Sequence, residues 1–253
     1  MLRGYYTSAN AIYTENRILN VISNNLANCK TAGYKTDEAI PTTFAESMLL
    51  IRGRHSETGT IRYRTLQDTY TFLEEGTLQE TDSLLDCAIV GPVYYNIQQY
   101  GTDEVLLTKN GQFSIADDGD LELGNIGKVL DVNGNTINLG TSRFNIGVNG
   151  LIVTEDGREF QLGLSYIADY TDVEKVGDTL FRPYDPAPAG NIPDGVFYEM
   201  RQGWYERSNV DVGEEMVRAM DANNVFRANA QALQIANSIN QIAANDLMKK
   251  SGR

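Results

Sequence analysis

The sequence predicts an α+β protein in which long helices at the two ends of the chain flank a central antiparallel all-β domain. Apolar residues recur with helical spacing near both ends of the 253-residue chain. Between these ends, Asn-Gly and Asp-Gly pairs, which favour tight turns between antiparallel strands, separate short apolar runs. Acidic charge also gathers in the middle of the chain. These three observations divide the sequence into two terminal helical segments and one β segment.

The formal net charge of −13 is distributed unevenly along the chain. Residues 1–67 carry 8 basic and 5 acidic side chains, residues 68–194 carry 6 and 22, and residues 195–253 carry 7 of each. Self-repulsion keeps an acidic surface soluble, whereas nearly neutral ends permit close association with other chains. An acidic chain also repels phosphate backbones, so nucleic acid is not an expected partner.

Residues 5–28 have the pattern of an amphipathic helix. One apolar stripe repeats every seven residues, no glycine or proline interrupts it, and Gly33 follows its end as a stop signal. Asparagines, which are poor helix formers, surround the stripe, and so many amides favour hydrogen bonds to neighbouring chains. The stripe consists of Tyr5, Ile12, Leu19, Ile22 and Leu26, and the amides nearest its end are Asn24, Asn25 and Asn28.

Residues 211–248 have a second and longer helical pattern. Ser208 or Asn209 is expected to cap its start, and acidic residues follow in the first turn. At about 1.5 Å per residue the helix would be nearly 60 Å long, so much of it should need partners outside its own domain. Its apolar positions include Val212, Met216, Ala219, Phe226, Leu233, Ile235, Ile239 and Ile242, and asparagines such as Asn229 interrupt them.

The segment between the helices has the pattern of an antiparallel β domain. Its turn signals and strand candidates alternate from about residue 84 to residue 205. The turn pairs are Asn110-Gly111, Asp118-Gly119, Asn133-Gly134, Asn149-Gly150, Asp156-Gly157 and Asp194-Gly195. The strand candidates are 86–90, 93–98, 104–108, 112–115, 128–132, 151–154, 159–162 and 164–168.

Residues 31–80 are predicted to form an extended linker with strand segments, and 44–51 is a candidate short helix. Threonine, glycine and charged residues dominate this connection. A modest basic cluster within it favours solvated or inter-subunit ion pairs over nucleic-acid binding. The cluster consists of Arg52, Arg54, Arg62 and Arg64.

No constellation of residues predicts catalysis, a metal site or a cofactor. His55 is the only histidine, so no triad or histidine-based zinc site can be assembled. The acidic run at 117–120 lacks the ligand spacing of a calcium loop and is interpreted as an acidic turn. Cys29 and Cys87 lie in different contexts and are not expected to form a disulfide. No apolar run is long enough to span a membrane, and the N-terminus lacks the pattern of a cleavable signal.

The two terminal segments resemble those of the flagellar basal-body rod and hook proteins. The motif runs from Ile22 through Asn24-Asn25-Leu26-Ala27-Asn28 to Gly33-Tyr34-Lys35, and its C-terminal counterpart is Ser208-Asn209-Val210-Asp211 followed by Glu215-Met216. The runs 85–89 and 107–113 resemble parts of the β domain of the same family. Pro92 and the run Asn223-Asn224-Val225-Phe226 depart from the family pattern.

The resemblance implies a division of the chain and a set of interface residues. Residues 1–30 and 207–253 would be the two helices of an inner domain, pairing as a coiled coil, with a linker at 31–80 and a β domain at 81–206. The assembly interface would comprise the stripe and amides of the first helix, with Gly33, Tyr34 and Lys35 after it. From the C-terminal segment it would comprise Ser208, Asn209, Val210, Met216, Phe226, Asn229, Leu233 and Ile242.

The resemblance also implies a structural role without catalysis. The chain would be a subunit of the bacterial flagellar basal-body rod that polymerises helically into a drive shaft and export channel. Its partners would be itself, other rod and hook subunits and the flagellar type III export apparatus, in a rod crossing the periplasm or cell wall. The short 31–80 connection favours a proximal-rod type, with a distal-rod protein as the alternative. An oligomeric adhesive or ligand-binding β-domain protein is the alternative from a different class, and an acidic hydrolase has no positive support.

Overall fold

The computed structural model describes residues 2–43, 64–102, 104–141, 143–167, 172–184 and 192–251. The chain divides into two compact units. The helical unit comprises residues 1–26, 37–70 and 211–253, and the β unit comprises residues 27–36 and 71–210. Within the described residues, no helix has the length and apolar character that crossing a membrane requires. The α+β class with helices at both ends and a central antiparallel domain is therefore confirmed.

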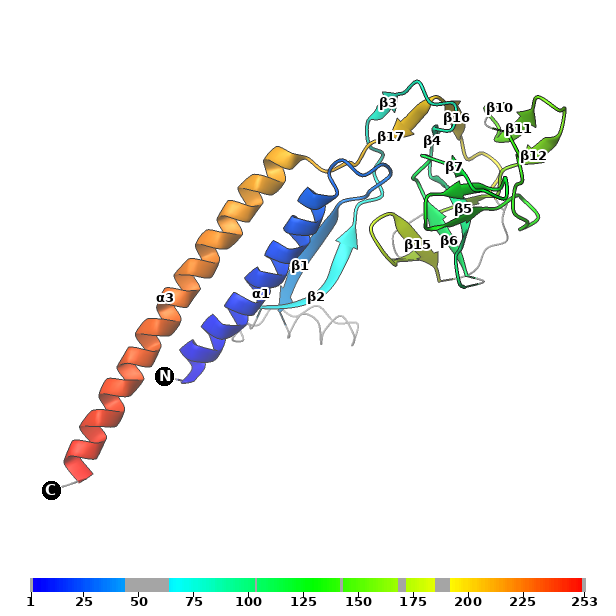
Figure 1. Cartoon of the computed structure of the whole chain (residues 1–253). Coiled ribbons are helices and arrows are strands. Elements are labelled where there is room, and N and C mark those ends of the chain that lie inside the picture. The colour runs from blue at the N-terminus through cyan, green and yellow to red at the C-terminus, as the bar shows by residue number, and fades with distance from the viewer. Residues whose placement is uncertain are drawn as a thin grey trace. The chain divides into compact units, whose positions relative to one another are not determined.

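Two long helices dominate the helical unit (Figure 1). Helix α1 spans Leu2–Ala27, and helix α3 spans Val212–Ser251 over 40 residues. Both correspond to the predicted helical patterns. Asp211 caps α3, because its Oδ1 accepts hydrogen bonds from the amides of Gly213 at 2.8 Å and Glu214 at 3.1 Å. The prediction that Ser208 or Asn209 caps this helix was therefore wrong.

A two-stranded sheet completes the described part of the helical unit. It pairs β1 (Asp37–Thr43) with β2 (Arg64–Thr71). Strand segments were expected in this connection, whereas the candidate helix at 44–51 lies outside the described residues. His55 and the basic positions Arg52, Arg54 and Arg62 also lie outside them, as does the side chain of Arg64.

The β unit is built from short strands joined mainly by tight turns. Its largest sheet has eight strands in the order β14-β15-β6-β5-β9-β8-β7, with β13 paired to β5, and smaller ladders join β10-β11-β12, β16-β4 and β17-β3. Every ladder for which the register is given in this unit is antiparallel. The strands are β3 (Leu78–Glu80), β4 (Cys87–Val90), β5 (Val93–Gln99), β6 (Val105–Thr108), β7 (Ser114–Ile115), β8 (Leu121–Leu123), β9 (Gly127–Val129), β10 (Phe144–Ile146), β11 (Leu151–Thr154), β12 (Glu159–Gln161), β13 (Leu164–Tyr166), β14 (Val173–Lys175), β15 (Leu180–Pro183), β16 (Glu199–Gln202) and β17 (Trp204–Glu206).

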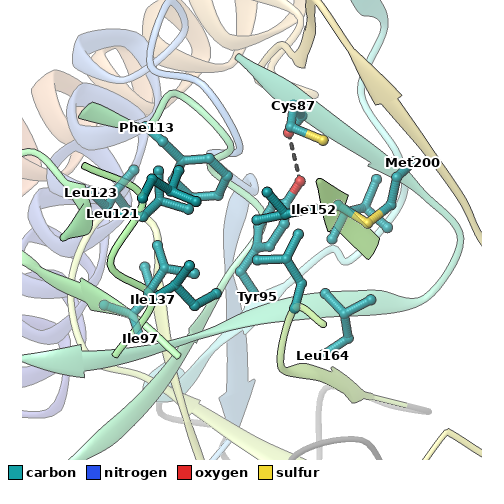
Figure 2. Close-up of a cluster of buried hydrophobic side chains, with 14 of the residues drawn as sticks. Cys87, Tyr95, Ile97, Phe113, Leu121, Leu123, Ile137, Ile152, Leu164 and Met200 are labelled. Carbon is teal, nitrogen blue, oxygen red and sulfur yellow. Dashed lines mark hydrogen bonds between the residues drawn. The ribbon is translucent and has the colours of Figure 1, made fainter. Parts of the chain in front are cut away.

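Strand β5 separates two apolar clusters because successive side chains of a strand point to opposite faces. Val93, Tyr95 and Ile97 belong to the larger cluster, whereas Tyr94 belongs to the smaller one with Phe181. In the larger cluster the Tyr95 hydroxyl donates a hydrogen bond to the Cys87 carbonyl at 2.7 Å (Figure 2). The buried tyrosine therefore keeps a partner for its polar end.

Five of the six predicted turn pairs have their glycine in the left-handed region that such turns require. Asn110-Gly111 is the exception. A Cβ on Gly111 would lie 1.7 Å from the Cys87 carbonyl oxygen, so this glycine permits a close backbone approach and does not turn a hairpin. The prediction of a tight turn at Asn110-Gly111 was therefore wrong, and the close backbone approach accounts for the glycine.

Candidate assembly interface

Large apolar side chains are exposed on both helices of the helical unit. On α1 they are Tyr6 and Tyr13. On α3, Ile235, Ile239 and Ile242 are 61%, 47% and 62% exposed, and Val212, Met216, Val217, Met220 and Val225 are exposed nearer its start. Large exposed apolar groups gathered on one element are typical of an interaction surface.

The predicted stripe residues of α1 are partly covered within the chain. Ile22 is buried, whereas Tyr5, Ile12, Leu19 and Leu26 are half-buried. On α3, Phe226 and Leu233 are half-buried, and Met216 and Ile242 are exposed. The structure therefore divides the predicted interface residues between intramolecular packing and the open surface.

The predicted interface amides are likewise divided between contacts within the chain and the open surface. Asn25 is buried, and its side chain makes two hydrogen bonds with the backbone of Asp37. It donates to the Asp37 carbonyl at 2.8 Å and accepts from the Asp37 amide at 3.1 Å. Asn28 accepts from the Thr31 hydroxyl at 3.1 Å. Asn229 donates to a carbonyl of its own helix at 2.9 Å, and Asn24 is exposed. Asn25 thus fixes how the chain leaves α1.

In the β unit, the segment that follows α1 meets the segment that precedes α3. Lys35 and Glu206 are both buried, and the Lys35 ammonium donates to Glu206 Oε1 at 2.6 Å. Lys35 also donates to the Glu74 carbonyl at 2.6 Å. The Gly33 amide donates to the Glu206 carbonyl at 2.8 Å. We call Lys35, Lys109, Glu206 and Asn209 the terminal clasp.

Lys109 brings a second buried ammonium to the terminal clasp. Its Nζ lies 3.9 Å from Glu206 Oε2 and donates to the carbonyls of Ile89 at 3.1 Å and Gly91 at 2.5 Å. Burial lowers the pKa of Lys109 to about 8, against the opposing effect of the nearby Glu206 carboxylate. One carboxylate therefore serves two buried lysines.

Asn209 closes the terminal clasp on its other side. Its Oδ1 accepts from the Thr36 amide at 2.8 Å and hydroxyl at 2.7 Å, while its Nδ2 donates to the carbonyls of Phe72 and Glu74 at 3.1 Å each. Tyr34 is buried beside the clasp, with the Lys175 ammonium 4.1 Å from the centre of its ring. The Ser208 hydroxyl accepts a hydrogen bond from the backbone amide of the half-buried Val210 at 3.3 Å. These predicted interface residues are used within the chain.

Sequence reasoning missed Lys109 and Glu206. A signal for Lys109 was present, because the residue directly follows the apolar run Leu106-Leu107 and Thr108 and precedes the pair Asn110-Gly111. Burial of a lysine requires a partner carboxylate. Nothing local to Glu206 identified it as that partner.

The acidic turn and the two cysteines, which were considered for metal binding or a disulfide, have structural roles. The Lys128 Nζ lies 2.5 Å from Asp118 Oδ2 and 2.7 Å from Asp120 Oδ2, so an ammonium group pairs with the acidic turn at 117–120. In the described part of the chain, no three metal-ligating side chains form a group suited to a metal ion. Cys29 and Cys87 are both free thiols, and burial raises the pKa of Cys87 to about 11.

Two family models match the ends of the chain where the terminal motifs lie. The model described as flagella basal body rod protein matches residues 6–35, and the model described as flagellar basal body rod FlgEFG protein C-terminal matches residues 201–247. These ranges include three of the four residues of the terminal clasp, Lys35, Glu206 and Asn209, and not Lys109.

Curated relatives match the chain over nearly its whole length. Flagellar basal-body rod protein FlgG of Bacillus subtilis (strain 168) is 29% identical over 268 residues, which cover 97% of this chain and 99% of the relative. FlgG of Buchnera aphidicola subsp. Schizaphis graminum (strain Sg) is 27% identical, covering 95% of this chain and 98% of the relative. Flagellar hook-basal body complex protein FlhP of Bacillus subtilis (strain 168) is 28% identical, with 94% and 97% covered.

Proposed function

The chain is a flagellar basal-body rod family protein, and we propose that it polymerises helically through α1 and α3 to form the drive shaft and export channel of the rod. The family is structural and is not an enzyme family. Membership implies assembly with other rod and hook subunits in the flagellar basal body. The observation that carries the proposal is the exposed apolar set on α3.

The proposal gives α1 and α3 a paired, inner position in the polymer. Side chains of both helices line one cavity within the helical unit, and Ile22 of α1 and Ala222 of α3 are both buried. These features support the pairing of the helices as a coiled coil. The exposed isoleucines in the second half of α3 would then be covered by neighbouring subunits.

The β unit would form the outer layer of the polymer. It contains its own apolar core, so it can remain folded whether or not the helices have partners. We propose that the chain reaches this position through the flagellar type III export apparatus and that the rod crosses the periplasm or cell wall. We also propose that the subunit is of the proximal-rod type, with the distal-rod type as the alternative that a labelled subunit in a map of the basal body would decide.

Aspartate substitutions on the helices test the proposal. Leu19→Asp, Leu233→Asp and Ile239→Asp should each abolish incorporation into rods, and with it motility, while the β-sheet signal in circular dichroism is retained. Val148→Asp is the matched control, because Val148 is 66% exposed in the β unit. Normal motility with all three helix variants would contradict the proposal. Saturable binding of a glycan by the β unit would favour the adhesive alternative.

A further inference from the structure

Glu215 is a buried carboxyl group at the junction of three elements of the helical unit. It lies in the first turn of α3, and together with residues of α1 and β1 it lines a cavity of about 340 Å³. Glu215 is only 4% exposed, whereas the side chain of the adjacent Glu214 is 61% exposed. The proposed assembly through exposed apolar side chains gives this buried carboxyl group no role.

The hydrogen bonding of Glu215 is incomplete. Its Oε2 has no hydrogen-bond partner among the described residues. A hydrogen bond from Asn25 of α1 supports the carboxylate, and the Arg218 Nη1 lies 3.8 Å from Glu215 Oε1. Burial with an unpaired oxygen costs the ionised carboxylate more than it costs the neutral carboxyl group. The site therefore favours the protonated form of Glu215.

Arg218 is shared between three carboxylates and cannot fully neutralise Glu215. Its Nη2 donates to Glu214 Oε1 at 2.8 Å, and its Nη1 lies 3.5 Å from Glu38 Oε1 of β1. The contact with Glu214 is the shortest of the three. The Arg218 side chain is also 40% exposed, so water screens its charge.

The other charged groups around the cavity are acidic. Glu15 of α1, Asp37 of β1 and Asp221 of α3 line it together with Glu38 and Glu215. Glu15 and Asp37 have interactions of their own, so neither adds an unpaired charge. Among the described residues that line the cavity, the single basic one is the Arg218 already shared between carboxylates.

The balance of these effects favours proton binding by the folded chain. Burial is the largest effect and raises the pKa of Glu215 above its ordinary value of 4.5. The Arg218 charge and the hydrogen bond from Asn25 oppose this shift, and the negative charges of Glu214 and Glu38 add to it. The resulting stability is fully present below the ordinary value and is lost as the pH rises through the raised one.

We propose that Glu215 is a proton-operated switch of the helical unit. Binding of one proton at this buried carboxyl group tightens the packing of α1 and β1 on the beginning of α3, and release of the proton loosens it. The switch acts within one chain and needs no partner. Its consequence for the polymer rests on the proposed function, because acid then favours the packed arrangement of the helices through which the subunit assembles.

Thermal unfolding of the full chain at two pH values tests the switch. Helical circular dichroism follows α1 and α3, whereas the fluorescence of Trp204 follows the β unit. Glu215→Gln replaces the carboxyl group by a neutral group of the same shape. At about pH 7.5 the helical midpoint of this variant should exceed that of the wild type by about 4 °C. At about pH 5 the difference should shrink, because the wild-type carboxyl group is then largely protonated.

Glu214→Gln is the matched control. It removes the same charge from the adjacent position and from the same Arg218, but it leaves the buried carboxyl group in place. This variant should keep the wild-type gain in helical stability on acidification, and the Trp204 transition should be the same in both variants. An equal pH response of wild type and Glu215→Gln, or no helical transition at either pH, would overturn the inference.

A direct titration does not depend on the folding of any variant. In the wild-type chain labelled with carbon-13 at the glutamate carboxyl groups, the Glu215 resonance should titrate above the resonance of Glu214. Titration of Glu215 at or below the ordinary glutamate value would contradict the switch.

Incorporation of the wild-type chain into rods in cells is scored separately. A chain that enters rods but shows no proton linkage at Glu215 would overturn the switch and leave the proposed function standing. A chain that shows the linkage but never enters rods would overturn the proposed function and leave the switch. The two failures are therefore distinguishable.

Discussion

Lys35 and Glu206 are separated by 171 residues in sequence, yet the Lys35 ammonium donates a 2.6 Å hydrogen bond to the Glu206 carboxylate, and both side chains are buried. Lys35 follows α1 closely and Glu206 precedes α3. The ion pair therefore ties together, inside the β unit, the two chain segments that lead to the helices.

Removal of either partner should destabilise the β unit. Lys35→Met leaves the Glu206 carboxylate with the Gly76 amide and the more distant Lys109 ammonium, and the free energy of unfolding should fall by about 3 kcal/mol. Glu206→Gln should cost more, because two buried ammonium groups lose their carboxylate. Urea unfolding followed by the fluorescence of Trp204, the single tryptophan, measures both. Arg201→Met breaks the exposed pair with Glu199 and should cost less than about 1 kcal/mol; an equal loss in all three would contradict this.

Gly33 should tolerate no side chain. Its φ is +67°, and an added Cβ would lie 2.4 Å from the backbone nitrogen of Asn110. Gly33→Ala combines backbone strain with this clash and should destabilise by more than about 2 kcal/mol. Gly134 has a similar φ of +82°, but a Cβ added there would meet no atom of the described residues within 4 Å, so Gly134→Ala should cost only about 1 kcal/mol. Thermal unfolding of the two variants compares them, and the reverse order would exclude the clash.

Stability should rise between about pH 8 and pH 9 because of Lys109. Its folded-state pKa is lowered to about 8, below the ordinary value of 10.5. In this window the unfolded chain binds more protons than the folded chain, so raising the pH favours folding. Above pH 9 the raised pKa of Cys87, about 11, acts in the opposite direction. Lys109→Met should flatten the slope between pH 8 and 9 in urea titrations, whereas an unchanged slope would show that another group causes it.

The β unit should be more stable when it includes Lys35, Thr36 and Asn209. The predicted β-domain range 81–206 contains Glu206 and lacks Lys35, Thr36 and Asn209. A chain cut to residues 27–210 keeps the whole terminal clasp and should unfold cooperatively, with a midpoint in urea well above that of residues 81–206. Circular dichroism during urea titration of both proteins is the measurement. Equal midpoints would mean that the terminal clasp contributes nothing to the stability of this unit.

The features predicted from the sequence are the local ones. The stripe containing Leu19 and Ile22 gives α1, the run after Asp211 gives α3, and Asp156-Gly157 gives the turn between β11 and β12. These signals depend on neighbouring residues alone, namely on periodicity and on a left-handed glycine. They were sufficient for the fold class.

The features that were missed depend on long-range contacts. Strands β16 and β17 alternate charged, polar and large residues around Gly203, without a strong turn pair, and they are fixed by pairing with β4 and β3. The burial of Lys109 depends on Glu206, which lies far along the chain. Similarly, the amide of Asn25 was expected to face other chains, but its bonds to Asp37 depend on where the chain turns after α1.

The terminal clasp also determines when the β unit can fold. A polypeptide that leaves a ribosome, or a narrow conduit, with its N-terminus first presents Lys35 early and Glu206 late. Contacts between distant segments form slowly because a long loop must be closed first. The last strand of the β unit, β17, can pair with β3 only after residue 206 of the 253 has emerged. The sequence separation of one ion pair thus delays completion of this unit until its C-terminal segment is free.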